Sequence, residues 1–377
     1  MSFACTVERV EIEPHPNADR LEIAKVNGYR ACVRKDALQS GDLAVYIPEA
    51  ALLPDWLIEH MGLEGMLSGA RKNRVKAVKL RGELSQGLVL PVKRMGQNMN
   101  GEIQSVADRF EGSWAPGDDL TELLEIKKYE PTVPVSMQGK IAKGNYFDFA
   151  FKYDPENIKK RVPFEPEEQV VMLEKIHGTF VVVAFIPDAI AMREAIPHSI
   201  LISSKGLWAR GQVLDAQNDQ DNLYVRTIKR SGLVDAFMRH PDLGEDIERP
   251  LYFMGEIFGR GVQDLHYGAN EPQVRFFDMA VQLPNREIMY LDYPTFRGVM
   301  WDMNIPTAPL LYTGPYNQEM VNAYTSGEEM VSGEKLHMRE GVVIKSLQER
   351  LDARGNRCIV KSVSADYLLR KNGTEYN

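Results

Sequence analysis

The sequence predicts an α+β protein of two domains, with a small β-rich domain at the N-terminus and a larger, mainly antiparallel domain after it. The first reason is length, because 377 residues exceed what one small hydrophobic core holds. The second is that about the first 100 residues consist of short apolar stretches separated by Gly and Pro, such as "ACTVERVEI" and "GLVLPV", which is typical of a small barrel or sandwich. The third is that strand and helix patterns are mixed from about residue 166 onward.

The domain boundaries follow changes in composition along the chain. Residues 1–125 carry the β-rich pattern, and residues 166–377 carry the longer strands. Between them, residues 126–165 contain several prolines, two glycines and many lysines, which predicts a basic interdomain linker. In the second domain we expect helices near 219–240 and 293–303, and strands at 169–174, 179–186, 199–204, 250–258, 273–282, 340–346 and 357–363.

Composition excludes several classes of protein. Apolar residues make up 44% and charged residues 26% of the chain, as in an ordinary globular protein. No apolar run reaches the roughly 18 residues that a membrane span requires, and the N-terminus lacks a secretory signal. The three cysteines, Cys5, Cys32 and Cys358, are scattered and form no CxxC pair. We therefore expect reduced thiols in a cytoplasmic or otherwise intracellular protein that is not secreted. We also expect a monomer without a membrane partner.

The net charge of −8 argues against a phosphate-rich partner, but the charge is unevenly distributed. Residues 71–94 hold eight Lys/Arg and one Glu, a net charge of +7, whereas residues 102–125 hold seven Asp/Glu and one Arg, a net charge of −6. A basic patch attracts a phosphate backbone even on an acidic protein. The alternative is an edge strand that lysines keep soluble. Candidates for phosphate-backbone contacts are Arg74, Lys76, Lys79 and Arg81.

Lys175 interrupts an apolar strand pattern. It lies in "MLEKIHGTF", residues 172–180, with "QVVML" running into this stretch and "FVVVAF" running out of it. A strand buried on both faces reads as a continuous apolar run, in which unpaired charges are rare. Lys175 is therefore a candidate functional residue, and the alternative is a sheet-edge lysine whose amine reaches water.

Six short motifs carry a family resemblance. "EKIHGT" resembles the Lys-x-Asp/His-Gly motif of the covalent nucleotidyltransferases, which include RNA and DNA ligases and mRNA capping enzymes. The other five follow in that superfamily's order: "ISSKG" (202–206), "FMGEIFG" (253–259), "VRFFDMAV" (274–281), "EGVVIK" (340–345) and "CIVKSV" (358–363). The resemblance implies that residues 166–377 form an antiparallel-sheet nucleotidyltransferase (adenylyltransferase) domain of ATP-grasp-like ligase type.

The N-terminal domain narrows the resemblance. "HPNADRLEIAKVNG", residues 15–28, resembles the opening of the tRNA-binding type of OB-fold, so residues 1–125 are expected to be an OB-fold RNA-binding domain. An OB domain that precedes the catalytic domain resembles the ATP-dependent RNA ligases of family 5, and the likeness covers almost the whole chain. DNA ligases and capping enzymes usually carry the OB domain after the catalytic one. An RNA-binding protein with an inactive second domain would be expected to lack Lys175, Glu340 or Lys361, and all three are present.

The resemblance implies a three-step reaction with RNA and ATP as substrates. Lys175 attacks the α-phosphate of ATP to give lysyl-AMP, AMP moves to an RNA 5′-phosphate to give AppRNA, and a 3′-hydroxyl then seals the bond. A lysine attacks only when neutral, and burial and nearby cations lower its ordinary pKa of about 10.4. Mg²⁺ or Mn²⁺ is the expected cation, and a nicked duplex with a 3′-OH RNA strand is the expected substrate.

Roles in the nucleotide pocket follow from the same resemblance. Lys361 and Lys345 are expected at the phosphates, and Glu340 and Glu256 at the metal, although Glu256 is instead a candidate for the ribose hydroxyls. Phe276 or Phe277 is expected to stack on adenine, but only one of them, because neighbouring strand residues face opposite ways. The other expected pocket residues are Glu174 at the purine edge, Lys205 at the ribose or a phosphate, and Ile176, His177, Gly178 and Ser204.

Two positions depart from the family pattern. His177 stands where the commoner residue is Asp, which removes a carboxylate from that place. The fifth motif has one lysine, Lys361, where many relatives have Lys-x-Lys, and Val363 occupies the second position. Candidates for the missing cation are Arg370, Lys371 and Lys345.

Overall fold

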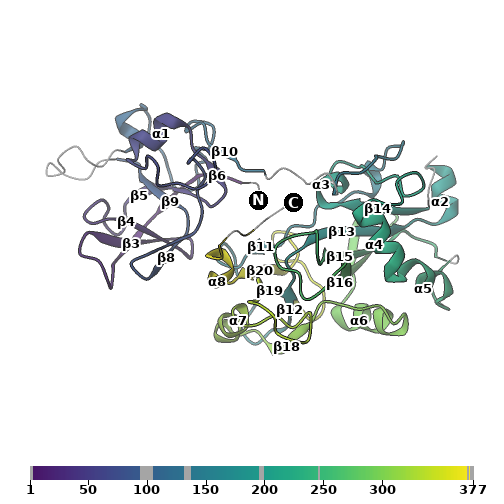
Figure 1. Cartoon of the computed structure of the whole chain (residues 1–377). Coiled ribbons are helices and arrows are strands. Elements are labelled where there is room, and N and C mark those ends of the chain that lie inside the picture. Colours follow the sequence, from purple (N-terminus) through teal and green to yellow (C-terminus); the bar gives the residue numbers. More distant parts are fainter. Residues whose placement is uncertain are drawn as a thin grey trace. The chain divides into compact units, whose positions relative to one another are not determined.

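The computed structural model describes residues 3–93, 105–130, 137–194, 199–244, 247–371 and 373. The chain divides into two compact units, Met1–Glu130 and Pro131–Asn377, and each is described by itself (Figure 1). In the part of the chain described, no helix is both long and apolar enough to cross a membrane.

The N-terminal unit is built from short antiparallel strands around two apolar clusters. Its sheets have the strand orders β1-β5-β9, β2-β3-β4, β7-β8 and β10-β6. Residues such as Val7, Val45 and Leu57 are fully buried in one cluster, and Ala24 and Ala44 in the other. The elements are β1 (Thr6–Arg9), β2 (Glu11–Pro14), β3 (Leu21–Val26), β4 (Tyr29–Arg34), β5 (Leu43–Ile47), β6 (Ala51–Leu52), α1 (Asp55–His60), β7 (Val78–Leu80), β8 (Glu83–Ser85), β9 (Leu88–Pro91), the 3₁₀ turn η1 (Val106–Asp108) and β10 (Lys127–Lys128).

The C-terminal unit contains two five-stranded sheets. One has the order β11-β20-β19-β12-β18 and the other β14-β13-β15-β16-β17. All pairings are antiparallel except the short parallel pair β11–β20. The strands are β11 (Glu156–Asn157), β12 (Gln169–Lys175), β13 (Thr179–Phe185), β14 (Ile200–Ser204), β15 (Leu251–Phe258), β16 (Gln273–Gln282), β17 (Ile288–Tyr290), β18 (Leu310–Pro315), β19 (Gly341–Ser346) and β20 (Ile359–Val363).

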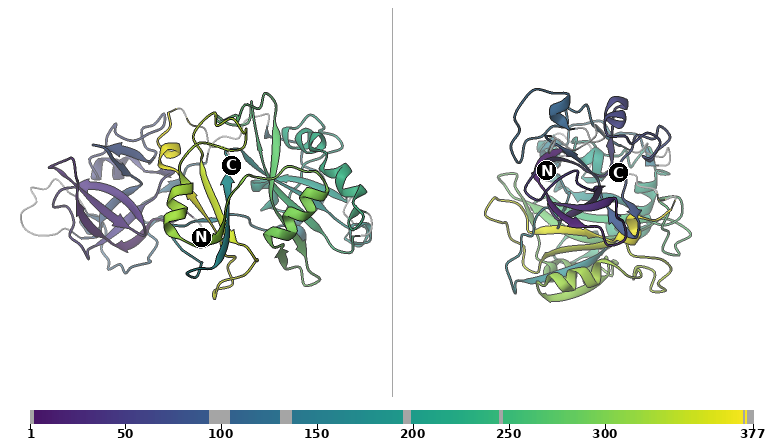
Figure 2. Two further views of the ribbon diagram at one scale, coloured as in Figure 1. Left: turned by 90° about the horizontal axis from the view of Figure 1, so that it is seen from below. Right: turned by 90° about the vertical axis from the view of Figure 1, so that its left-hand side faces the viewer.

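Helices pack on these sheets (Figures 1 and 2). The predicted helix at 219–240 is divided into two, because Gly232 adopts a left-handed conformation with φ of 76° between them. Of these, α4 packs on β14 and β16, while α7 packs on β19 and β20. The helices are α2 (Asp188–Arg193), α3 (Lys205–Trp208), α4 (Leu223–Ser231), α5 (Leu233–Arg239), α6 (Tyr293–Asp302), α7 (Gln318–Thr325) and α8 (Ala365–Leu368), with the 3₁₀ turn η3 at Phe147–Phe149.

The segment predicted to be a linker, residues 126–165, is divided between the two units. β10 pairs with β6 in the N-terminal unit. η3 and β11 belong to the C-terminal unit, where β11 pairs with β20. Residues 131–136 of this segment lie outside the described residues.

The turn between β12 and β13 joins the two sheets of the C-terminal unit. β12 ends at Lys175 in one sheet, and β13 begins at Thr179 in the other. Gly178, the last residue of the turn, lies so close to β15 that a Cβ atom there would overlap the carbonyl oxygen of Ile257. A glycine is therefore required for the chain to cross at this point, and the crossing places Lys175 where both sheets can contribute side chains.

Candidate active site

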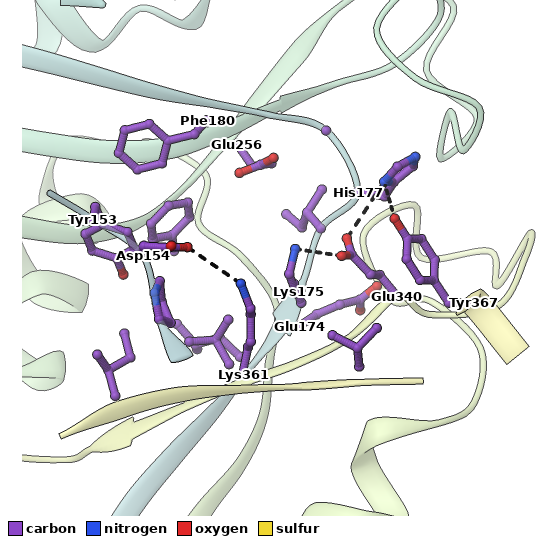
Figure 3. Close-up of a pocket in the computed structure, with 18 of the residues that line it drawn as sticks. Tyr153, Asp154, Glu174, Lys175, His177, Phe180, Glu256, Glu340, Lys361 and Tyr367 are labelled. Carbon is purple, nitrogen blue, oxygen red and sulfur yellow. Dashed lines mark hydrogen bonds and ion pairs between the residues drawn. The ribbon is translucent and has the colours of Figure 1, made fainter. Parts of the chain in front are cut away.

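A cavity of about 320 Å³ is lined by side chains from both sheets of the C-terminal unit (Figure 3). Its lining includes eleven of the thirteen residues predicted for the nucleotide pocket, which come from segments far apart in the sequence. The eleven are Glu174, Lys175, Ile176, His177, Gly178, Lys205, Glu256, Phe277, Glu340, Lys345 and Lys361. Ser204 and Phe276 are the two that do not line it.

Lys175 projects into this cavity from the end of β12 and forms an ion pair there. Its Nζ atom lies 2.7 Å from Oε1 of Glu340, and 26% of its side chain is exposed. Register explains the proximity, because Lys175 is paired with Gly341, the residue after Glu340. The amine therefore faces the pocket rather than open solvent, and in this state its charge is balanced by Glu340.

Two carboxylates beside Lys175 suit a divalent cation. Among the residues described, Oε2 of Glu340 is buried without a hydrogen-bond partner. Burial raises the pKa of Glu256 to about 8, with nearby Lys175 opposing the rise and Glu340 adding to it. A buried orphan oxygen and a destabilised carboxylate both favour added positive charge. The described residues contain no group of three His, Cys, Asp or Glu placed to hold a metal. Two carboxylates suit Mg²⁺ or Mn²⁺ that is bound jointly with phosphates and water, because such ions are commonly held by one or two carboxylates plus phosphate oxygens.

His177 is held by residues that the sequence patterns did not predict. Its Nε2 atom lies 2.8 Å from Oδ1 of Asp264, and its Nδ1 atom lies 2.8 Å from the Tyr367 hydroxyl. Both contacts are satisfied when Nε2–H donates to Asp264 and Tyr367 donates to Nδ1. Arg370 donates to Asp264 at 2.9 Å, so this arginine, a candidate for the missing cation, already has an anionic partner. Asp264 thus places a carboxylate next to His177, near the position where the commoner motif has Asp.

The second cation near Lys361 is Lys205. Lys205 Nζ donates to Oδ1 of Asp154 at 2.9 Å, and Lys361 Nζ lies 3.6 Å from the same oxygen. Burial lowers the pKa of Lys361, and Asp154 partly offsets that effect. Lys205, at the start of α3, therefore places a second ammonium group near Lys361 through the shared Asp154.

Lys345 has a different environment from the one predicted. It is almost fully buried, with Nζ 2.8 Å from Oδ1 of Asp278 and 3.6 Å from Glu349. Burial opposes ionisation of Asp278, but Arg357 and Lys345 outweigh it and lower the pKa of that carboxyl. The charge of Lys345 is thus balanced within the protein, yet Lys345 lines the cavity, so its role at the phosphates stays a prediction.

The two phenylalanines predicted as adenine platforms lie in different environments. Phe276 is fully buried in the core, where its ring packs edge-on against Phe253, so it cannot serve as an adenine platform. Phe277 lines the cavity together with two aromatic residues that were not predicted, Phe180 and Tyr153. The Tyr153 ring stacks on Phe180 with 5.5 Å between ring centroids.

Glu174 is buried at the cavity, where its Oε2 accepts a hydrogen bond of 2.7 Å from the backbone N–H of Met330. Burial raises the pKa of Glu174 to about 7, and the contacts with Met330 and Arg339 limit the rise. Ser204 does not line the cavity, and its side chain forms a hydrogen bond with the buried Tyr224 hydroxyl.

The four basic residues of the N-terminal unit are not equivalent. Arg74 is half buried and its guanidinium lies 3.7 Å from the centroid of the Tyr129 ring, so it has a structural contact. Lys76 is exposed, Lys79 lies on the exposed strand β7, and Arg81 is in the turn after it. Arg94, at the end of the basic stretch, lies outside the described residues.

The residues missed by sequence reasoning share one property. Tyr153, Asp154, Asp264 and Tyr367 lie in loops or in a one-turn helix, without periodicity or a familiar motif around them. Phe180 is the exception, because it lies two residues after Gly178 in an apolar strand, where successive side chains alternate between the two faces of the sheet.

Comparison with known proteins agrees with this arrangement. A family model described as RNA ligase matches residues 168–363, and a model of an OB-fold domain matches residues 4–92. A search of curated proteins finds no significant match. Among solved structures, the chain is similar to Naegleria gruberi RNA ligase with PPi, with a TM-score of 0.74, 21% identity and 98% of each chain covered. Mutants of that ligase with AMP and Mn (TM-score 0.74, 23% identity) and with ATP and Mn (TM-score 0.75, 22% identity) are also similar, each covering 97% of this chain and 98% of the other.

The match of the RNA ligase family model to the antiparallel-sheet domain, whose cavity is lined by lysines, places the protein among the ligases. The chain belongs to the RNA ligase family, because the family model matches more than half of its length. The predicted fold class and the predicted family are both confirmed.

Proposed function

We propose that this protein is an ATP-dependent RNA ligase that joins a 3′-hydroxyl to a 5′-phosphate, with nicked duplexes carrying a 3′-OH RNA strand as its preferred substrate. The observation that supports it most is the position of Lys175, whose Nζ lies 2.7 Å from Glu340 in a cavity that also contains Glu256 and Lys361. The solved Naegleria gruberi ligase structures with ATP, AMP and Mn support the choice of nucleotide and metal.

The first step forms lysyl-AMP on Lys175. Glu340 is the ion-pair partner of Lys175 in the free protein. Glu340 and Glu256 would hold the divalent cation, and Glu340 would then no longer neutralise Lys175, which would favour the uncharged amine that attacks. A divalent cation held by Glu340 and Glu256 supplies positive charge at the phosphates. Lys361 and Lys205 stabilise charge on the α-phosphate while pyrophosphate leaves.

The same residues serve the two later steps. AMP is transferred from Lys175 to the RNA 5′-phosphate, and the 3′-hydroxyl then displaces AMP from AppRNA. Phe277 holds the adenine against the pocket wall, and Glu174 contacts the purine edge. RNA is bound in part by Lys76, Lys79 and Arg81 of the OB-fold, which are exposed.

Nick sealing tests this proposal. The protein is incubated with ATP, Mn²⁺ or Mg²⁺ and nicked duplexes that differ only in having RNA or DNA at the 3′-hydroxyl end. We expect sealing of the RNA nick, AppRNA-type intermediates when the 3′-hydroxyl is replaced by hydrogen, and no product from Lys175→Ala. Equal sealing of an all-DNA nick would identify a DNA ligase instead, and a protein adduct formed with GTP but not ATP would identify a capping-type enzyme.

A further inference from the structure

Asp154 occupies a position between the two lysines that are expected to bind phosphate. Its Oδ1 atom lies 2.9 Å from Lys205 Nζ and 3.6 Å from Lys361 Nζ, and all three residues line the cavity. Figure 3 shows the Asp154 carboxylate directed at Lys361 across the pocket. One anionic oxygen shared by two ammonium groups is the arrangement that a phosphate oxygen would make with the same lysines.

The chain on both sides of Asp154 is fixed. The Tyr153 hydroxyl donates to Oδ2 of Asp278 at 2.9 Å, and its ring stacks on Phe180 of β13, in the same sheet as Asp278. On the C-terminal side, Asn157 of β11 pairs with Lys361 of β20. Residues 153–157 therefore connect the two sheets at this end of the cavity, and Asp154 cannot move far from the lysines without breaking these contacts.

The carboxylate is charged under ordinary conditions. Burial alone would raise the pKa of Asp154, but Lys361 and Lys205 together outweigh burial and lower it. A negative charge therefore lies between the two lysines, on a segment that is anchored on both sides.

We propose that Asp154 is an internal competitor for the polyphosphate of the nucleotide, and that it weakens the binding of pyrophosphate after Lys175 has been adenylylated. This inference rests on the proposed function. By competing for Lys205 and Lys361 and by repelling a highly charged anion, Asp154 disfavours the reverse of the first step. In that reverse step an oxygen of pyrophosphate forms a bond to the α-phosphorus, the P–N bond to Lys175 breaks, and the nitrogen takes up the proton given up by pyrophosphate or solvent. Asp154 thereby favours transfer of AMP onward to RNA.

Pyrophosphate-driven discharge of the purified protein–AMP adduct tests the proposal. The adducts of the wild-type protein, Asp154→Asn and Asp154→Glu are mixed with metal and increasing pyrophosphate, and the loss of labelled AMP is followed in a single turnover. We expect the half-maximal pyrophosphate concentration of Asp154→Asn to fall about tenfold or more, while Asp154→Glu, which keeps the charge, stays close to the wild type. The matched control is Asp148→Asn, an exposed aspartate of the same segment that pairs with Arg286 outside the cavity.

The outcomes separate the two proposals. Failure of the wild-type protein to form an adduct would overturn the proposed function and this inference with it. An adduct whose half-maximal pyrophosphate concentration is unchanged or higher in Asp154→Asn overturns the inference alone, and would mean that Asp154 only orients the two lysines. Comparison of thermal unfolding temperatures for all four proteins shows that each variant is folded.

Discussion

Lys175 and its neighbours form a site in which lysine and arginine side chains are paired with carboxylates of the protein. Lys175 is paired with Glu340, Lys205 and Lys361 share Asp154, and Arg370 is paired with Asp264. Under the proposed function, adenylylation would exchange the first two of these pairings for contacts with a cation and with phosphate. Of the cavity carboxyls Glu174 and Glu256, Glu256 is the one whose pKa burial raises further, to about 8.

Glu256 gives a pH-dependent prediction for stability. Its pKa rises from an ordinary value of 4.5 to about 8 because of burial, so between these values the folded protein binds a proton that the unfolded chain has lost. The free energy of unfolding therefore falls as pH rises through this window. Glutamine carries no charge at any pH, so Glu256→Gln should become more stable than the wild type as pH rises, by up to about 4 kcal/mol near pH 8, with little difference near pH 4.

Urea unfolding at several pH values in the presence of a chelator measures this difference. Glu248→Gln, at an exposed position, is the matched control and should show no such trend. Added Mn²⁺ should stabilise the wild type more at high pH than at low pH, and Glu256→Gln much less. A stability difference between Glu256→Gln and wild type that is independent of pH would contradict the environment assigned to Glu256.

At the scale of elements, the turn between β12 and β13 determines the position of the nucleophile. Gly178 is the residue that allows it, because a Cβ atom would overlap the Ile257 carbonyl oxygen and lie 2.9 Å from Cγ of Glu256. The β13–β15 pairing holds Ile257 in place, so the strand cannot retreat without losing ladder hydrogen bonds.

Gly178→Ala should therefore lower the free energy of unfolding by roughly 1–3 kcal/mol and displace Lys175 from Glu340. The matched control is Gly298→Ala in α6, where no atom lies within 4 Å of the added Cβ. That helix-interior change should raise stability by about 0.5–1 kcal/mol. Thermal or urea unfolding distinguishes the two, and equal effects of both alanines would refute the steric argument.

The elements also show why some of this structure was predictable. The seven predicted strands lie within two residues of the observed bounds, because strands buried on both faces leave long apolar runs in the sequence. β18 was missed because it is a partly exposed strand with Gly314 and Pro315 at its end. The helix at 219–240 was predicted as one because Gly232 gives only a weak signal within an otherwise helical pattern.

The candidate site shows the same division. Motif residues were found because each lies in a short recognisable stretch, and the fold brings eleven of them to one cavity. Pairings between distant segments, such as Asp154 with Lys205 or His177 with Asp264, leave no local pattern. For the same reason the sequence did not reveal that Lys345 is paired with Asp278 beneath the pocket.

At the scale of the whole molecule, an acidic protein carries a basic stretch on its OB-fold unit. Lys76, Lys79 and Arg81 are exposed there, whereas Arg74 stacks on Tyr129. If these residues contact the RNA backbone, then binding is separable from the chemistry at Lys175.

The triple substitution of Lys76, Lys79 and Arg81 by glutamine, which leaves Arg74 in place, should weaken RNA sealing without changing the rate of adenylylation. The binding constant falls as salt concentration rises. Each lost phosphate contact should make the plot of log binding constant against log salt concentration less steep, by about 1 in the magnitude of its slope. Lys229→Gln, at the exposed end of α4, is the control for a simple change in net charge. Unchanged sealing in the triple variant would mean that these residues only keep an edge strand soluble.

The most direct test of the whole account is the site of nucleotide attachment. The protein is incubated with Mn²⁺ and ATP labelled at the α-phosphate, then digested, and the labelled peptide is sequenced by mass spectrometry. The account predicts AMP attached through a phosphoramide bond to the side-chain nitrogen of Lys175, and no label in Lys175→Ala. Label on a different residue, or label retained by Lys175→Ala, would contradict it.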